Sequence, residues 1–197
     1  SHYRSPLDGR ERNGDDLEEL LLEAINGAQN EILVAVQELS LPRLAQALAR
    51  QHHRGLRVRV VLENTYSTPW SEQHEAGLSP HLRQRRQQLM AMADRNHDGQ
   101  LSLEELQQGD AVAILQQAGV PLIDDTADGS KGSGLMHSKY LVVDRAVVIT
   151  GSTNFTASCI HGDAGAHQSR GNVNHLLRFE SPALAKHFSS DFERMWG

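Results

Sequence analysis

Residues 137–154 read HSKYLVVDRAVVITGSTN, in which two short apolar runs stand on either side of a polar pair. The runs, 140–143 and 146–149, are rich in the β-branched residues that favour strands. Asp144 and Arg145 lie between them and suit a tight turn. This stretch therefore predicts a β-hairpin, the end of which carries polar side chains.

Side chains two positions apart on a strand point the same way, so His137 and Lys139 are expected on one face of this hairpin. A turn centred between Asp144 and Arg145 would place Lys139 opposite Thr150 and His137 opposite Ser152. Asn154 would then arrive beside His137. The sequence thus predicts a histidine, an ammonium group and an amide around one small site.

Such a group suits attack on a phosphodiester, because fixed donors can hold the charge on the non-bridging oxygens. A histidine that is mostly neutral at neutral pH can supply the nucleophile, which assigns that role to His137. Lys139 and Asn154 are the candidate donors, supported by Ser152. Asp144 lies seven residues from His137, roughly 20 Å along a strand, and is predicted to be structural.

The spacing His-x-Lys, four residues, Asp, six residues and Gly-Ser-x-Asn resembles the signature of the phospholipase D superfamily. It is most similar to the small bacterial nucleases of that superfamily, which carry one motif per chain. The resemblance implies metal-independent hydrolysis through a phosphohistidine, with a second histidine protonating the leaving oxygen. Because the sequence holds no second His-x-Lys, it also implies a homodimer with one composite site.

The remaining chain has the order of elements expected for an α/β protein. Strands are predicted at 31–36 and 176–179, and residues 54–62 are predicted to form a turn that leads into a strand. Helices are predicted at 17–26, 41–54, 111–118 and 182–196. We expect a single domain with a central mixed sheet and helices on both faces. Residues 64–110 form an insertion between the second and third strands of that sheet.

The insertion contains a second motif, DRNHDGQLSLEE at 94–105, whose positions match the 12-residue calcium loop of an EF-hand. Gly99 permits the sharp bend, and Ser102 could act through water. Predicted helices at 82–93 and 103–108 flank the loop. We therefore predict calcium, bound for structure or regulation, with oxygen ligands from Asp94, Asn96, Asp98, Gln100 and Glu105.

One position departs from the resemblance. Members of the superfamily often carry a glutamate before an asparagine after the motif, whereas Val173 precedes Asn174 here. Glu38, Glu63 or Asp163 could supply the missing carboxylate. The departure keeps open a catalytically silent, calcium-responsive binding module, and shared chemistry keeps open phospholipid hydrolysis or head-group transfer.

The net charge, the apolar runs and the cysteine count of the chain limit the kinds of partner and setting that it suits. With 19 Lys and Arg against 25 Asp and Glu, the net charge of −6 is unexpected for a protein that relies on bulk attraction to nucleic acid, although calcium bound to the loop would offset part of it. Lys131 lies in a Gly/Ser-rich loop before the motif and could reach the site. No apolar run is long enough to span a membrane, and the single cysteine, Cys159, excludes an internal disulfide. We expect an endonuclease with a nucleic acid substrate, DNA or RNA; the resemblance favours a periplasmic or secreted setting.

Overall fold

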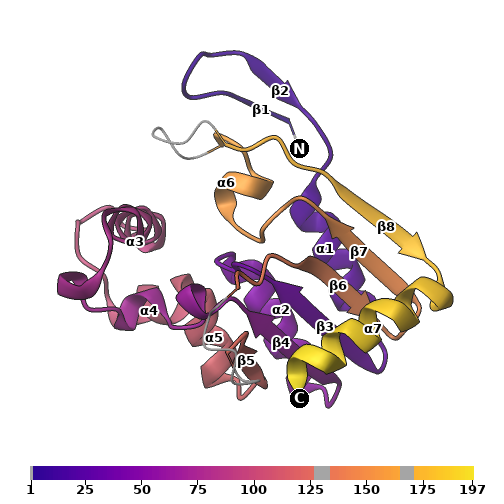
Figure 1. Ribbon diagram of the computed structural model, residues 1–197. Coiled ribbons are helices and arrows are strands. Elements are labelled where there is room, and N and C mark those ends of the chain that lie inside the picture. The colour runs from indigo at the N-terminus through magenta and orange to yellow at the C-terminus, as the bar shows by residue number, and fades with distance from the viewer. Residues whose placement is uncertain (1, 127–133, 165–170) are drawn as a thin grey trace.

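The computed structural model describes residues 2–126, 134–164 and 171–197, and its centre is a six-stranded mixed sheet (Figure 1). The strand order is β5-β4-β3-β6-β7-β8. The first three strands run parallel to one another, and β6 is antiparallel to β3 and β7. The strands are β3 (Glu31–Val36), β4 (Arg57–Leu62), β5 (Leu122–Asp124), β6 (Lys139–Val143), β7 (Val147–Gly151) and β8 (Leu176–Glu180).

Helices cover both faces of the sheet, which explains the continuous apolar runs at 32–36 in β3 and 60–62 in β4. Ile32, Val34 and Val36 face the larger core, formed with the helices α1 (Leu17–Gly27), α2 (Pro42–His53) and α5 (Ala111–Gln117). Leu33 and Ala35 point to the opposite face, where helix α7 (Pro182–Trp196) packs. The predicted α/β fold with helices on both faces is confirmed.

The helix starts follow local signals in the sequence. Asp16 caps α1 by accepting a hydrogen bond from the Glu19 N–H, and Ser181 caps α7 in the same way. Helix α2 begins with Pro42, whose missing N–H costs nothing at that position. These caps fix where the helices begin and therefore which residues face the sheet.

The β6–β7 hairpin forms as predicted, but its register differs by one residue. Tyr140 pairs with Thr150 and Val143 with Val147, so Lys139 does not lie opposite Thr150. Asp144 and Arg145 both adopt positive φ, as in a type I′ turn, and Ala146 is an extra residue before β7 begins. This extra residue shifts every cross-strand pair relative to a simple two-residue turn.

Residues 64–110, the segment predicted to be an insertion, follow β4 and precede α5. They contain three short 3₁₀ helices, η1 (Asn64–Tyr66), η2 (Trp70–Glu72) and η3 (Glu75–Gly77), then α3 (Pro80–Ala93) and α4 (Leu103–Gly109). Trp70, Leu89 and Ala93 form a small core of their own. Helix α3 stands to one side of the sheet (Figure 1).

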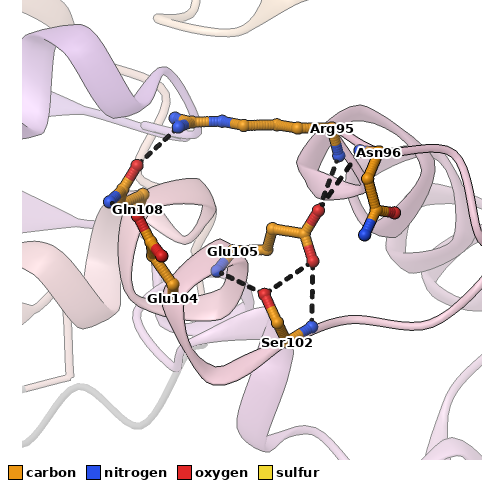
Figure 2. Close-up of a pocket in the computed structure, with 6 residues that line it drawn as sticks. All are labelled: Arg95, Asn96, Ser102, Glu104, Glu105 and Gln108. Carbon is orange, nitrogen blue, oxygen red and sulfur yellow. Dashed lines mark hydrogen bonds between the residues drawn. The ribbon is translucent and has the colours of Figure 1, made fainter.

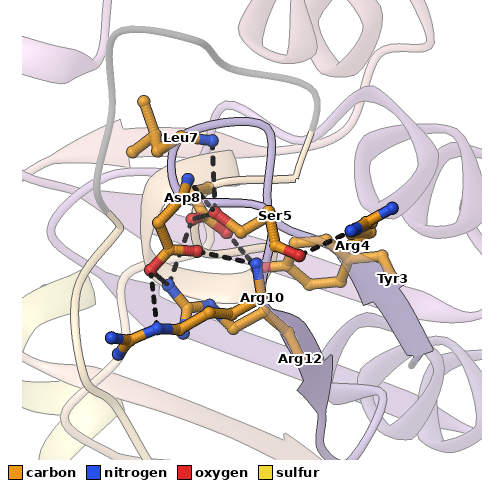
Figure 3. A network of polar contacts seen from close by, with 9 residues as sticks. Tyr3, Arg4, Ser5, Leu7, Asp8, Arg10 and Arg12 are labelled. Carbon is orange, nitrogen blue, oxygen red and sulfur yellow. Dashed lines mark hydrogen bonds and ion pairs between the residues drawn. The ribbon is translucent and has the colours of Figure 1, made fainter.

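An N-terminal hairpin, β1 (His2–Arg4) with β2 (Glu11–Asn13), was not predicted. Its strands are short and polar, so they carry no apolar alternation. Figure 3 shows the polar network of this hairpin, in which Asp8 pairs with Arg12 at 3.1 Å. The hairpin is fastened to the residues after the short helix α6 (Ala157–Ile160), because Ser5 donates to the carboxylate of Asp163 at 2.6 Å.

Within the described ranges, none of the helices combines the length and the apolar character needed to cross a membrane.

Candidate functional site

His137 and Lys139 lie at the start of β6, next to the carboxyl end of β3. His137 precedes the strand and is exposed, whereas Lys139 is its first residue, pairs with Val36 and is only 8% exposed. The Lys139 ammonium donates to the carbonyl oxygen of His137 at 3.1 Å. Burial lowers the pKa of Lys139 from its ordinary value. The predicted nucleophile thus stands at the surface directly beside a shielded ammonium group.

Ser152 and Asn154 follow the end of β7 and complete the same corner. The Ser152 hydroxyl donates to Asn174 Oδ1 at 3.0 Å and lies 3.3 Å from His175 Nδ1. The Asn154 amide donates to Gln37 Oε1 at 3.2 Å, and its own Oδ1 is buried without a hydrogen-bond partner among the described residues. The second half of the motif is therefore held by residues that lie far away in the sequence.

Cys159 lies beside this corner on α6, a position that no pattern in the sequence predicted. Burial raises the pKa of its thiol, but hydrogen bonds from Thr156, from Asn172 and from the Asn154 backbone outweigh burial and lower the pKa overall. A thiolate at Cys159 would in turn favour the charged form of Lys139. Nothing in the sequence around a single cysteine indicates this proximity, because the contacts depend on the path of the loop after β7.

His175 was also missed. It precedes β8, and its N–H donates to the Ser152 hydroxyl at 3.2 Å while its carbonyl accepts from the Ser152 N–H at 3.2 Å. Gly151 explains the close approach, since a Cβ there would lie 2.1 Å from the His175 carbonyl oxygen. The glycine of the Gly-Ser-x-Asn motif thereby lets the two segments meet.

Asp144 lies at the opposite end of β6. Its carboxylate accepts three backbone hydrogen bonds, from the N–H groups of Gln29 (2.8 Å), Asn30 (2.7 Å) and Glu31 (2.9 Å). These contacts join the β6–β7 turn to the segment that enters β3. They give Asp144 a structural role at a distance from His137.

Val173 is fully exposed, and the three carboxylates that could replace the missing glutamate are engaged elsewhere. Glu38 pairs with Arg85, and Asp163 accepts from the N-terminal hairpin. Glu63 accepts from the backbone and hydroxyl of Thr65. None of the three has a hydrogen bond to His137 among the described residues.

The predicted calcium loop folds back on itself through its own side chains. Asp94 accepts from the Gly99 N–H at 2.9 Å, Asn96 from the Asp98 N–H at 3.0 Å, and Asp98 from the Gln100 N–H at 2.7 Å. Gly99 has a φ of 77°, which supplies the expected bend. The bend thus lies where the motif places it.

Glu105 closes the loop and lies in the first turn of α4 (Figure 2). Its carboxylate accepts from the Ser102 hydroxyl at 2.7 Å, the Ser102 N–H and the Arg95 N–H, and these bonds, led by that of the hydroxyl, lower its pKa to about 2. A cavity of about 260 Å³ lies beside it. Across residues 2–126, 134–164 and 171–197, however, no three His, Cys, Asp or Glu side chains gather closely enough to hold a metal.

The corner formed by residues 137–139 and 152–154 has the chemistry of an anion site. It offers the Lys139 ammonium, the Asn154 amide and the Ser152 hydroxyl, with the exposed His137 imidazole as a possible nucleophile. Lys131 falls outside the described residues.

Comparisons with known proteins agree with this geometry. The family model described as "Cardiolipin synthase, PLD-like domain" matches residues 21–196. Mitochondrial cardiolipin hydrolase of Xenopus laevis is 30% identical over 176 residues, covering 89% of this chain and 59% of the relative. The human protein of that name is 26% identical over 184 residues, covering 93% of this chain and 52% of the relative. The chain thus spans little more than half the length of these relatives.

Among solved structures, the phospholipase D family member Nuc from Salmonella typhimurium superposes with a TM-score of 0.53 at 20% identity, covering 91% of this chain and 86% of Nuc. At that identity the superposition supports the fold alone. The family match extends over nearly the whole chain and includes both halves of the motif. This chain therefore belongs to the family of PLD-like domains described as cardiolipin synthase, within the phospholipase D superfamily.

Proposed function

We propose that this protein hydrolyses phosphodiester bonds in nucleic acid as a metal-independent endonuclease, with His137 as the nucleophile. The observation that carries the proposal is the exposed His137 beside the shielded ammonium of Lys139, with Ser152 and Asn154 at the same corner. A shielded cation interacts more strongly with a phosphate oxygen than a solvated one does. Lys139 and Asn154 would therefore stabilise the charge that develops on the non-bridging oxygens.

Two histidines would share the chemistry. The imidazole nitrogen of one His137 forms a bond to phosphorus while the bond from phosphorus to the leaving oxygen breaks. A second, protonated histidine gives its proton to that oxygen. The same histidine then takes a proton from water, whose oxygen attacks phosphorus and releases His137.

The second histidine would come from another copy of the chain, which makes the functional unit a homodimer. Edge strand β8 supports this arrangement because Leu177 and Phe179, two residues apart on one face, remain 51% and 38% exposed. Strand β8 directly follows His175, which contacts Ser152. If β8 paired with β8 of a second, two-fold related copy, its edge would no longer be unpaired, the exposed apolar side chains would be covered and the two motifs would be brought together.

Phospholipid hydrolysis is the second candidate function. Relatives bearing the name cardiolipin hydrolase support it, and so does Leu135, a large apolar side chain two residues before His137 that is 61% exposed. The same covalent steps would serve either substrate, since both are phosphodiesters. The choice between them depends on which substrate the surface around His137 admits.

Calcium is proposed as a ligand of the 94–105 loop, acting in stability or regulation rather than in catalysis. The oxygen donors of Asp94, Asn96, Asp98 and Glu105 suit a hard cation, and Gly99 already supplies the bend. Binding would require the Glu105 carboxylate to exchange its bonds to loop N–H groups for the ion. The loop lies on the 64–110 insertion, outside the corner that holds His137.

The test is cleavage of plasmid DNA in excess EDTA by the wild type, by His137→Asn and by the exposed control His53→Asn. Circular dichroism first establishes that each chelated protein is folded. Cleavage by the wild type and His53→Asn, with none by His137→Asn, would support the proposal. Residual cleavage by a folded His137→Asn would refute the role of His137. Release of phosphatidic acid from cardiolipin vesicles, without DNA or RNA cleavage, would favour the second candidate.

A further inference from the structure

We infer that Gln37 is a positioning residue for Asn154 and sets the direction in which that amide meets a phosphate oxygen; this role rests on the proposed function. Gln37 follows directly after β3 and lies 117 residues from Asn154 in the sequence. The superfamily motif in this chain does not include it. Its position makes it a link between the two halves of the site.

The backbone of Gln37 is fixed on both sides. Its N–H donates to the carbonyl oxygen of Ser138, the residue between His137 and Lys139, at 3.0 Å. Its own carbonyl accepts from the Glu63 N–H at 3.2 Å, which extends the β3–β4 pairing beyond the strands. A side chain that starts from a backbone held in this way has few directions open to it. The side-chain amide of Gln37 therefore extends toward the site from a backbone that two hydrogen bonds hold in place.

The side chain of Gln37 reaches the other half of the motif. Its Oε1 accepts a hydrogen from Asn154 Nδ2 at 3.2 Å. The next residue, Phe155, is held in parallel by a backbone bond from its N–H to the Glu38 carbonyl at 3.0 Å. The Ser138 and Asn154 segments are thus tied to the same end of β3, one through the Gln37 backbone and one through its side chain.

The orientation of the Asn154 amide follows from this contact. An amide nitrogen carries two hydrogens, so one can engage Gln37 while the other remains for a phosphate oxygen. Asn154 Oδ1 is buried and has no hydrogen-bond partner among the described residues, so nothing on that side would hold the amide in place. An accepting oxygen at Gln37 favours the nitrogen of Asn154 over its oxygen at that contact. Without it, the amide could rotate and turn its oxygen toward the phosphate.

The test measures binding of orthovanadate, a phosphate-like anion, in a double-mutant cycle. Gln37→Met preserves side-chain length and removes the acceptor. We expect it to weaken orthovanadate binding roughly threefold to tenfold, the effect of one hydrogen bond. In the Asn154→Ala background the same change should alter binding less than twofold, because Gln37 would act only through Asn154. Equal melting temperatures for wild type and Gln37→Met would separate this role from general support of the fold.

Gln46→Met is the matched control, since Gln46 is also partly buried but lies on α2. It should leave orthovanadate binding unchanged. Equal losses from Gln37→Met in both backgrounds, or no loss in the wild-type background, would overturn the positioning role while leaving the proposed function standing. Failure of the wild type to bind orthovanadate or to hydrolyse any phosphodiester would overturn the proposed function and this role with it.

Discussion

Arg85 and Glu38 form an ion pair between helix α3 and the end of β3, with Arg85 Nε 2.6 Å from Glu38 Oε1. Both side chains are largely shielded, at 12% and 16% exposure, and the Arg85 guanidinium also lies over the ring of Tyr66. Glu38 follows Gln37, and its carbonyl accepts from the N–H of Phe155. Continuous contacts therefore run from helix α3, which enters the predicted calcium loop, to the residue after Asn154.

Arg85→Met is predicted to uncouple the insertion from the site. Removing one partner of a shielded, hydrogen-bonded pair should lower the free energy of unfolding by about 1–3 kcal/mol. If the loop controls activity through this contact, calcium should change the initial rate of the wild type and change that of Arg85→Met much less. Rates would be measured with calcium and with EDTA, below every melting temperature.

Arg83→Met is the control for that experiment, because Arg83 is exposed on the same helix and does not contact Glu38. It should respond to calcium as the wild type does. An equal calcium response in all three proteins would show that the Arg85–Glu38 pair does not transmit the effect.

Asp144 is predicted to contribute to stability and not to turnover. Asp144→Ala leaves three backbone N–H groups without their acceptor and places alanine at a φ of 51°, so the free energy of unfolding should fall by roughly 1–3 kcal/mol. Asp144→Asn keeps an acceptor oxygen and tolerates positive φ better, and should lose less. Urea unfolding measures both changes.

The second part of the prediction for Asp144 is that its substitution leaves turnover unchanged. The kcat of each folded Asp144 variant, measured well below its melting temperature, should match the wild type. A selective fall in kcat with stability unchanged would give Asp144 a part in the chemistry that its position at the far end of β6 does not explain.

The centre of the fold was predictable because its central strands are buried on both faces. The strand at 31–36 was predicted with its observed bounds, since its residues 32–36 are apolar without interruption, as is typical of a strand covered on both sides. The register of the hairpin was not predictable, because Ala146 is an extra residue that composition alone does not distinguish from a strand residue. The polar N-terminal hairpin was missed for the opposite reason, since its stability comes from contacts such as Ser5 with Asp163.

The candidate site divides in the same way. His137, Lys139, Ser152 and Asn154 could be named because they follow a fixed spacing in one hairpin. The positions of Gln37, Cys159 and His175 depend on how distant segments meet around that hairpin, and no local pattern records such meetings. Sequence therefore identified the chemical groups, while the structure identified what holds them.

Glu105 is predicted to link acid stability to the calcium loop. Its folded pKa of about 2 lies below the ordinary value of 4.5, so its contribution to stability is present above pH 4.5 and is lost as the pH falls toward 2. At pH 6 the melting temperature of Glu105→Gln should be lower than that of the wild type. The difference between the two melting temperatures should become smaller as the pH approaches 2. The exposed neighbour Glu104→Gln should show neither effect.

Calcium provides an independent measurement on the same variants. Added calcium should raise the melting temperature of the chelated wild type and of Glu104→Gln, because a ligand that binds only the folded state stabilises it. Glu105→Gln should gain little, since it lacks the closing carboxylate. Equal melting temperatures of the wild type with and without calcium would overturn the proposal that the 94–105 loop binds calcium.

The composite site makes a quantitative prediction for mixed dimers. Wild type and His137→Asn would be unfolded, mixed in equal amounts and refolded together, so that subunits pair at random. About one quarter of the dimers would then carry two His137 side chains, if the unit is a two-fold dimer. Since each cycle requires both histidines, activity should fall to about a quarter of that of an equal total amount of refolded wild type. Independent subunits would instead retain about half, because every wild-type chain would work alone.

A matched mixture with His53→Asn, exposed on α2, should keep full activity and so exclude losses caused by refolding. Sedimentation velocity on the same samples would establish that dimers form. Substitution of the exposed β8 side chains Leu177 and Phe179 by serine should shift the protein toward monomer and reduce its activity in parallel. Half activity from the His137→Asn mixture, with dimers present, would show that a single copy of the motif suffices and would overturn the shared site.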